Sequence, residues 1–306
     1  MEEETRNSRE DESVIASRTV ITTSTLYRDW YPGELRSISD TDKVRGDLAL
    51  EMAKSAIDSG LRLVVADRES SREFSQTLET IGAIVIRGEG TKRSPARRQV
   101  FEQAMSLPQS EAILWTEPEK VDIVRSVLEL ARPIVLGEAD LVIPARNPQD
   151  FREFYPNYMY DSEIVANRLF NRFLRKFGLL SEEVRDLDAF FGPRVFSKKA
   201  LELAMKKYRI KDERIRSANE FIDPEEYSDA IIFPIITALY NNLRVMGIEI
   251  PFQYPALQRQ NEAAAASGRL EEFRIYRERQ RKGILVGAAQ FLNYLQNKKS
   301  SIEEII

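Results

Sequence analysis

Between residues 19 and 146, short runs of β-branched residues alternate with stretches in which apolar residues recur at helical spacing. The sequence predicts strands over 19–23, 61–66, 83–86, 112–116 and 139–143. It predicts helices over about 41–59, 70–81, 94–105 and 120–131. Ser70 and Glu73 have the spacing of a capping box, so the second helix is expected to begin there. Short strand–helix–strand connections form right-handed crossovers, which predict an α/β fold with a doubly wound, mostly parallel sheet and helices on both faces.

The pattern after residue 146 is mainly helical. It predicts helices over 162–177, 197–208, 223–246 and 268–297, and a short strand over 248–254 that returns to the sheet. The last helix is highly charged at first and apolar from Ile284 to Leu295, which indicates docking onto the body or onto another subunit. We expect an acidic disordered tail over 1–17, one α/β domain over 18–255 and a helical C-terminal extension over 256–306.

Cysteine and histidine are both absent from the 306 residues. Their absence excludes disulfides, thiolate and imidazole metal sites, and nucleophiles that depend on cysteine or histidine. Chemistry must therefore use Asp, Glu, Lys, Arg, Tyr or Ser, together with a cation that prefers oxygen ligands. With 45 Lys and Arg against 49 Asp and Glu the net charge is −4, so no nucleic-acid partner is expected. The longest apolar run, 230–240, is too short to span a bilayer, and we expect a cytoplasmic protein.

Polar residues follow three of the predicted strands. Thr23 and Ser24 close the first strand, Asp67 closes the second, and Glu117 and Glu119 follow the fourth. Because ligands bind at the carboxyl ends of strands in an open parallel sheet, we expect these residues to converge on one cleft. Asp67 is a candidate acceptor of hydrogen bonds from a base or ribose, although taken alone it is better explained as the cap of a turn.

No glycine-rich dinucleotide or P-loop motif is present, so phosphate must be held in another way. Lys92, in the basic loop 88–93, and Arg97, in the first turn of the next helix, offer cationic side chains for a diphosphate. A solvated basic turn is the alternative interpretation of that loop. Tyr27, in the aromatic loop after the first strand, is a candidate for stacking on a nucleobase, with simple packing as the alternative.

Glu117 and Glu119 are separated by one residue directly after a predicted buried strand. In an extended segment residues i and i+2 point to the same side, so both carboxylates could face one cation. Oxygen ligands suit Mg²⁺ or Mn²⁺. The alternative is an acidic start to the following helix, which the helix dipole favours.

Six segments are similar, in order and spacing, to motifs of the GT-A nucleotide-sugar glycosyltransferases of the family 2-like group, which includes mannosylglycerate synthase and dolichyl-phosphate mannose synthase relatives. The segments are 20–24 (VITTS), 64–71 (VVADRESS), 96–98 (ARR), 112–119 (AILWTEPE), 138–146 (EADLVIPAR) and 186–196 (DLDAFFGPRVF). The sequence departs from the family pattern where Glu117 and Glu119 stand in place of the two aspartates of its Asp-x-Asp motif. The histidine that ligates metal in some retaining members is also missing.

The resemblance implies a GT-A-like fold and a hexosyltransferase that uses a nucleotide diphosphate sugar and a small polar acceptor. It implies that Asp67 contacts the base and that Glu117 and Glu119 hold Mg²⁺ or Mn²⁺ against the diphosphate. It places Asp188, with Asp186 beside it, on the acceptor side, where a carboxylate would deprotonate the acceptor hydroxyl. A homo-oligomer formed through the last helix is a further expectation.

Two alternatives remain open at the level of the sequence. A sugar-1-phosphate nucleotidyltransferase has a related fold, but its glycine-rich basic signature would stand at 24–28, where the sequence is STLYR. A catalytically degenerate sugar-nucleotide-binding protein is suggested by the Glu-for-Asp replacements at Glu117 and Glu119.

Overall fold

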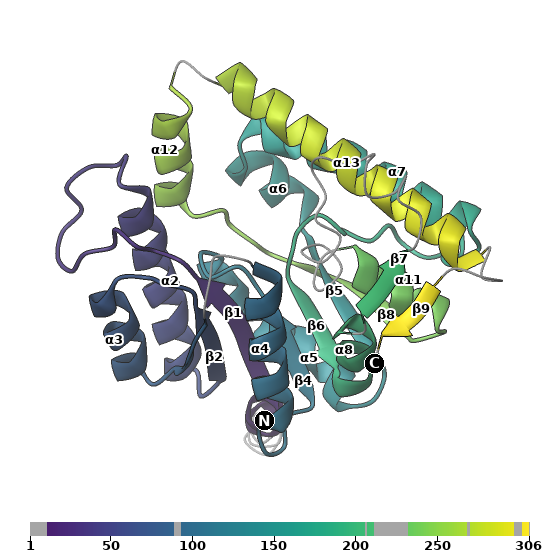
Figure 1. Cartoon of the computed structure of the whole chain (residues 1–306), viewed down its shortest axis with the longest axis horizontal. Helices are drawn as coiled ribbons and strands as arrows, with labels where there is room; N and C mark the ends of the chain where they lie inside the picture. Colours follow the sequence, from purple (N-terminus) through teal and green to yellow (C-terminus); the bar gives the residue numbers. More distant parts are fainter. Residues whose placement is uncertain are drawn as a thin grey trace, which may run out of the picture.

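A seven-stranded sheet with strand order β3-β2-β1-β4-β6-β5-β8 forms the centre of the computed structural model (Figure 1). The structure describes residues 11–88, 93–205, 207–210, 232–267, 270–296 and 302–305. The strands are β1 (Thr19–Thr25), β2 (Arg62–Asp67), β3 (Ile84–Arg87), β4 (Ala112–Trp115), β5 (Leu141–Arg146), β6 (Arg194–Ser197) and β8 (Val245–Ile250). Only β6 among these runs antiparallel to its neighbours. The predicted doubly wound, mostly parallel α/β fold is therefore confirmed.

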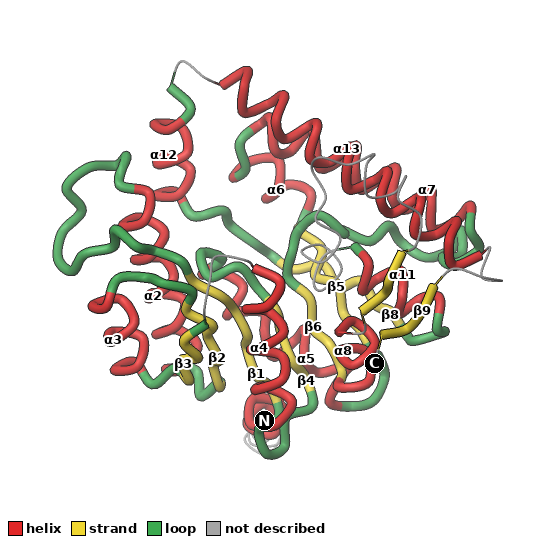
Figure 2. The backbone as a smooth tube through the Cα atoms, viewed as in Figure 1, coloured by secondary structure: helices red, strands yellow, loops and turns green. Residues whose placement is uncertain are grey.

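Helices cover both faces of this sheet (Figure 2). They are α2 (Thr41–Asp58), α3 (Arg72–Ile81), α4 (Arg93–Ser106), the 3₁₀ helix η1 (Val121–Ser126), α5 (Val127–Val135), α6 (Pro148–Phe154), α7 (Asn157–Lys176), α8 (Lys198–Met205), α11 (Phe233–Tyr240), α12 (Ala256–Ala265) and α13 (Leu270–Gln296). Successive side chains of a strand point to opposite faces, so Val20 of β1 enters one apolar core and Ile21 enters the other. The first core lies against α4, α7, α8, α11 and α13, and the second against α2, α3 and α5.

The carboxyl ends of β1, β2 and β4 lie at one edge of the sheet. Thr25 at the end of β1 is paired with Asp67 at the end of β2, and Thr22 is paired with Trp115 at the end of β4. Residues that follow these strands are brought together by the parallel register alone. The predicted convergence of the strand ends is confirmed.

The start of α3 differs by one residue from the prediction. The Oγ of Ser71 accepts a hydrogen bond from the Phe74 amide at 3.3 Å, so Ser71 is the N-cap. Ser70 does not cap the helix, because its hydroxyl instead accepts from the amide of Tyr27 at 2.9 Å. The helix ends as predicted at Gly82, whose φ of 104° is a left-handed conformation that favours glycine.

Three other sequence predictions are wrong. Residues 11–17 are helical and bury Ile15, whereas a disordered tail was expected over 1–17, of which 1–10 lie outside the described residues. The sequence does not predict the short strand β6. Four residues show little periodicity, and an antiparallel strand needs no helical crossover that would indicate it. The helix predicted over 223–246 extends too far. In the structure α11 ends at Tyr240, and residues 245 and 246 belong to strand β8. The part of the predicted helix before residue 232 lies outside the described residues.

Helix α13 packs along α7 and encloses the first apolar core (Figure 1). Ile284, Phe291 and Leu292 of its apolar half are each at most 3% exposed, and the Phe291 ring contacts Phe233 edge-on at 4.8 Å. The sequence indicated that this helix docks onto the body or onto another subunit. In the structure it packs against the body of its own chain. A separate pair of antiparallel strands, β7 (Lys207–Ile210) and β9 (Ile302–Ile305), joins the C-terminal region to the region after α8.

Candidate functional site

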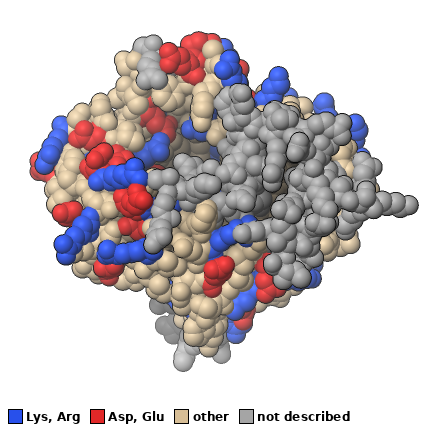
Figure 3. All heavy atoms as spheres, in the orientation of Figure 1, with Lys and Arg blue, Asp and Glu red and all other residues tan. Residues whose placement is uncertain are grey.

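The carboxyl ends of β1, β2 and β4 form one wall of a cavity of about 480 Å³. This volume lies in the range of small-molecule and cofactor sites. Ser24, Arg68 and Trp115 line the wall at the strand ends, while Glu163 of α7 and Arg277 of α13 line the opposite wall. On the face of the molecule drawn in Figure 3 the described blue and red side chains are interspersed, so they form no extended patch of one sign there.

Of the three residues predicted after β1, two line the cavity. Ser24 lies in its wall, whereas the hydroxyl of Thr23 is buried and donates to the carbonyl of Thr116 at 2.8 Å. The Tyr27 ring is only 4% exposed and packs edge-on against Phe74, so it is built into the wall and has no free face for a base. Its hydroxyl donates to Glu119 at 2.9 Å, and burial together with that carboxylate holds the pKa of Tyr27 well above its usual value.

Asp67 is buried and does not belong to the described cavity lining. Its carboxylate accepts from the hydroxyl of Thr25 and the amide of Ser70, both at 3.1 Å, and from the hydroxyl of Ser75. These donors fix the turn between β2 and α3. The geometry therefore favours the turn-capping interpretation of Asp67 over the base contact, and the neighbouring Arg68 takes its place at the cavity.

Cationic side chains enter the cavity from several elements. Arg97, in the first turn of α4, is 4% exposed, with its guanidinium carbon 5.4 Å from the centre of the Trp115 ring. The ammonium of Lys120, which follows β4, lies 4.8 Å from the Phe191 ring centre. Lys92 lies outside the described residues. Arg68 and Lys120 were not predicted as site residues, although Arg68 directly follows β2 and Lys120 lies in the segment after β4, where ligand contacts were expected.

Glu117 and Glu119 both line the cavity, but their carboxylates have different partners. The chain turns at Pro118, with the Lys120 amide donating to the Glu117 carbonyl at 3.2 Å, so the two residues are not in an extended segment. The Glu119 carboxylate accepts from Tyr27 and lies 4.0 Å from the guanidinium of Arg45. Among the described residues, no group of three or more Asp or Glu side chains is placed to hold a metal. A divalent ion held between Glu117 and Glu119 therefore does not fit this arrangement.

The Glu117 carboxylate lies against the α-carbon of Gly192. A Cβ at Gly192 would be 2.3 Å from Oε1, and Gly192 has a φ of 105°, so both the contact and the backbone favour glycine. Oε2 lies 3.9 Å from the Lys120 ammonium and is buried without a hydrogen-bond donor among the described residues. The guanidinium of Arg194 donates to the carbonyls of Ala189 and Pro193 and holds the loop that carries Gly192. Glu117 thus presents a fixed carboxylate at the cavity.

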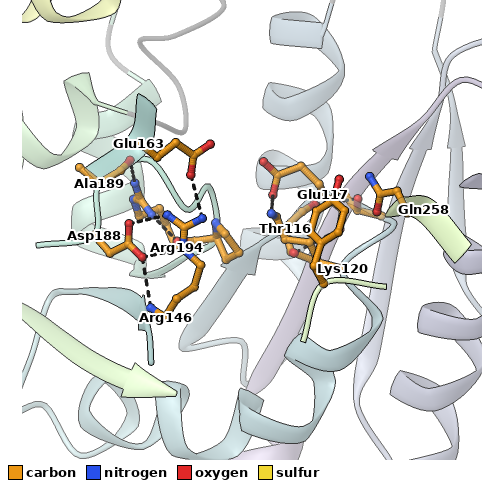
Figure 4. Close-up of polar contacts among 12 residues, drawn as sticks. Thr116, Glu117, Lys120, Arg146, Glu163, Asp188, Ala189, Arg194 and Gln258 are labelled. Carbon is orange, nitrogen blue, oxygen red and sulfur yellow. Dashed lines mark hydrogen bonds and ion pairs between the residues drawn. The ribbon is translucent and has the colours of Figure 1, made fainter. Parts of the chain in front are cut away.

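Neither of the predicted catalytic aspartates lines the cavity among the described residues. Asp188 accepts from Nε and Nη2 of Arg146 at 2.8 Å each (Figure 4). It also accepts from the side-chain amide of Asn167 at 2.7 Å. Burial raises the pKa of Asp188, but the charge and hydrogen bonds of Arg146 outweigh it and hold the pKa below its usual value. A carboxylate so engaged is a poor general base. Asp186 is half-exposed and pairs with Arg175 at 2.6 Å.

Arg146 is the centre of a buried charged network that the sequence analysis did not predict. Its Nη1 donates to Glu163 at 2.7 Å, and Arg281 of α13 pairs with the same carboxylate. Burial raises the pKa of Glu163, but the charges of Arg281 and Arg146 outweigh it and keep the pKa below its usual value. The guanidinium carbon of Arg146 lies 3.5 Å from the centre of the Phe151 ring. Glu163 shows no sequence signal, because it is one acidic residue in a helix with many charged residues.

Comparison with known proteins gives similarity of fold. No family model matches the sequence, and no curated protein matches it. Glucosyl-3-phosphoglycerate synthase from Mycobacterium tuberculosis in complex with phosphoglyceric acid is 14% identical with a TM-score of 0.49, covering 85% of this chain and 82% of that chain. A CMP:2-keto-3-deoxy-manno-octonic acid synthetase complexed with CTP is 12% identical with a TM-score of 0.44, covering 85% and 98%.

Proposed function

We propose that this chain is a glycosyltransferase that moves a hexose from a nucleotide diphosphate sugar to a small polar acceptor in the cavity described above. The observation that carries the proposal is the composition of the two walls. One wall is formed by the carboxyl ends of β1, β2 and β4, where open α/β sheets bind nucleotides. The facing wall contains Phe190, Phe191 and Gly192, which belong to the segment that resembles the acceptor-side motif of the family.

The chain's own residues supply the groups that a transfer of this kind needs. Arg68, Arg97 and Lys120 line the cavity and would bind the diphosphate as it accumulates charge on leaving. Glu117 would take the proton of the acceptor hydroxyl in an inverting reaction, because its Oε2 accepts no hydrogen bond from the described residues. The hydroxyl oxygen then bonds to the anomeric carbon, and the bond from that carbon to the diphosphate oxygen breaks. No step is assigned to the Mg²⁺ or Mn²⁺ predicted from the sequence.

The cytoplasmic location and the homo-oligomer expected from the sequence remain predictions. Within the described residues no helix combines the length and the apolar character needed to cross a bilayer. Analytical ultracentrifugation of the full chain would test the homo-oligomer.

Binding and turnover measured together test the proposed function. Calorimetric titration with uridine, guanosine, adenosine and cytidine diphosphate sugars should give micromolar affinity for one base, and release of that nucleoside diphosphate should accelerate with a small hydroxylated acceptor. Glu117→Gln should lower turnover at least about a hundredfold while donor affinity stays within threefold. Glu111→Gln, at a half-exposed residue paired with Arg18, is the matched control and should leave both unchanged.

Failure to bind any of these sugar nucleotides would contradict the proposal. Binding without turnover for any acceptor would instead support the sugar-nucleotide-binding alternative. Release of pyrophosphate from a nucleoside triphosphate and a sugar 1-phosphate would support a nucleotidyltransferase.

A further inference from the structure

We propose that the chain neutralises the donor diphosphate with its own Arg and Lys side chains and does not use a bridging divalent ion. This inference rests on the proposed function and concerns how the same cavity binds its donor. Among the described residues that line the cavity, seven are Lys or Arg and four are Glu. Asp188, which pairs with Arg146 of the lining, adds a fifth carboxylate, so this region has an excess of two positive charges in a chain whose net charge is −4. An anionic ligand of low charge fits that balance.

The acidic residues of the cavity are largely neutralised by arginines away from the strand ends. Arg146 and Arg281 both pair with Glu163. The guanidinium of Arg45 lies 4.0 Å from Glu119 and 3.5 Å from Glu262. These pairs hold the charges of Glu163, Glu119 and Glu262 in place within the protein.

Three cations come from three separate elements at that edge of the sheet. Arg68 follows β2, Arg97 lies in the first turn of α4, and Lys120 follows β4, and all three line the cavity. Arg68 and Arg97 are 6% and 4% exposed, so both charges act in a region of low dielectric constant where Coulomb attraction is strong. Guanidinium groups also bind phosphate oxygens in a bidentate manner. A diphosphate at this edge can therefore be contacted from several sides.

The carboxylates of Glu117 and Glu119, which were expected to hold a metal, each lie beside a cationic side chain of the protein. Glu119 is committed to Tyr27 and Arg45. The Lys120 ammonium, 3.9 Å from Oε2 of Glu117, already supplies a positive charge beside that carboxylate and would repel a second cation. A protein cation thus occupies the electrostatic role that a divalent ion would otherwise have.

The test is calorimetric binding of uridine, guanosine and adenosine diphosphate and of inorganic pyrophosphate to the full chain, in EDTA and, for the nucleotides, also in Mn²⁺. We expect nucleotide affinity in EDTA to lie within about twofold of that in Mn²⁺. Arg97→Gln and Lys120→Gln should each weaken binding in EDTA by about tenfold, the scale of a charge-assisted contact to phosphate. Lys120→Arg, which keeps the charge, should retain most of the affinity. Arg125→Gln, at a highly exposed side chain near the same strand, is the control and should bind like the parent.

The outcomes separate this inference from the proposed function. If Mn²⁺ raises nucleotide affinity tenfold or more in the parent and Glu117→Gln abolishes that gain, the inference is overturned while the proposed function stands. If pyrophosphate binds in EDTA but no nucleotide binds better than pyrophosphate, the anion site stands and the proposed function fails. If neither ligand binds under any condition, both are wrong. Circular dichroism of each variant confirms that a loss of binding is not a loss of fold.

Discussion

Arg146, the last residue of β5, and Asp188, in the segment before β6, form a two-pronged ion pair in which Nε and Nη2 each donate at 2.8 Å. The Arg146 amide also donates to the same carboxylate, at 3.1 Å. Arg146 is 1% exposed at its side chain, so Asp188 is the partner that makes its burial tolerable. The pair fixes the segment before β6 to the end of β5, an interior strand of the sheet.

Removing the charge of Asp188 should therefore affect stability more than chemistry. Asp188→Asn leaves the buried Arg146 guanidinium with Glu163 as its remaining acidic partner, and we expect the free energy of unfolding to fall by about 3–5 kcal/mol. Chemical denaturation measures this change. Asp186→Asn, at a half-exposed side chain two residues away, should change it by no more than about 0.5 kcal/mol. Equal effects of the two substitutions would contradict the assignment.

The same pair predicts a pH dependence. The pKa of Asp188 is lower in the folded chain than its ordinary value near 4, so the folded state binds fewer protons than the unfolded state around that pH. The stability contributed by the charge is complete above about pH 5 and is lost as pH falls through the lowered pKa. The difference in unfolding free energy between the parent and Asp188→Asn should thus shrink between about pH 4 and pH 2. A constant difference over this range would contradict the pairing.

Asp67→Ala should also act mainly on stability. Its carboxylate accepts from Thr25, Ser70 and Ser75, and loss of these contacts should cost about 2–4 kcal/mol of unfolding free energy. Affinity for a nucleoside diphosphate, measured well below the melting temperature, should change less than about threefold, because Asp67 is not among the described residues of the cavity wall. A large loss of affinity at unchanged stability would show instead that Asp67 contacts the base.

Gly192→Ala should displace Glu117. The new methyl group would lie 2.3 Å from Oε1, and the φ of 105° is costly for any residue with a Cβ, so we expect about 1–3 kcal/mol of destabilisation and a marked loss of turnover. Gly33→Ala is the matched control, because Gly33 has a φ of 88° but open space around the added Cβ. It should show the backbone cost with full turnover. Retained turnover in Gly192→Ala would argue against a fixed position for Glu117.

Leu292→Ala tests whether α13 belongs to the body of the chain. Leu292 is 1% exposed in the first apolar core, and truncation should lower the unfolding free energy by about 2–5 kcal/mol. Val286→Ala, at a residue 38% exposed on the same helix, should cost less than about 1 kcal/mol. If both substitutions are neutral but change the sedimentation coefficient, the helix packs against another subunit instead.

The central strands and the edge at which they converge could be predicted from the sequence because local patterns determine both. The β-branched run of β1 and the apolar run of β2 end in polar residues, and the parallel register then brings those ends together. Strand β6 could not be predicted in this way, because its four residues form a strand only by pairing with β4 and β5. Local pattern is informative only where an element is long enough to display a period.

The candidate site was predictable in location but less so in the roles of its residues. Ser24, Arg97 and Glu117 were identified and do line the cavity. Glu119 is occupied by Tyr27, which is 92 positions away in the sequence, and Asp188 by Arg146, which is 42 positions away. Such pairings depend on the tertiary structure, so a carboxylate that looks available in the sequence can already have its partner in the fold.

The reversed direction of β6 has a consequence for how the specificity of this fold can diverge. Because β6 runs antiparallel to β5, the end of β5 lies beside the start of β6. The chain between them therefore leaves the sheet and returns to it at the same ends of the strands. The length of the connection over 147–193 can therefore change without shifting the register of β5 against β6, provided that the buried residues of α7 and the Arg146–Asp188 pair are kept. Under the proposed function, variation in this connection would alter which acceptor is recognised and leave untouched the wall formed by β1, β2 and β4. Donor and acceptor preferences would then evolve as separate traits on one scaffold.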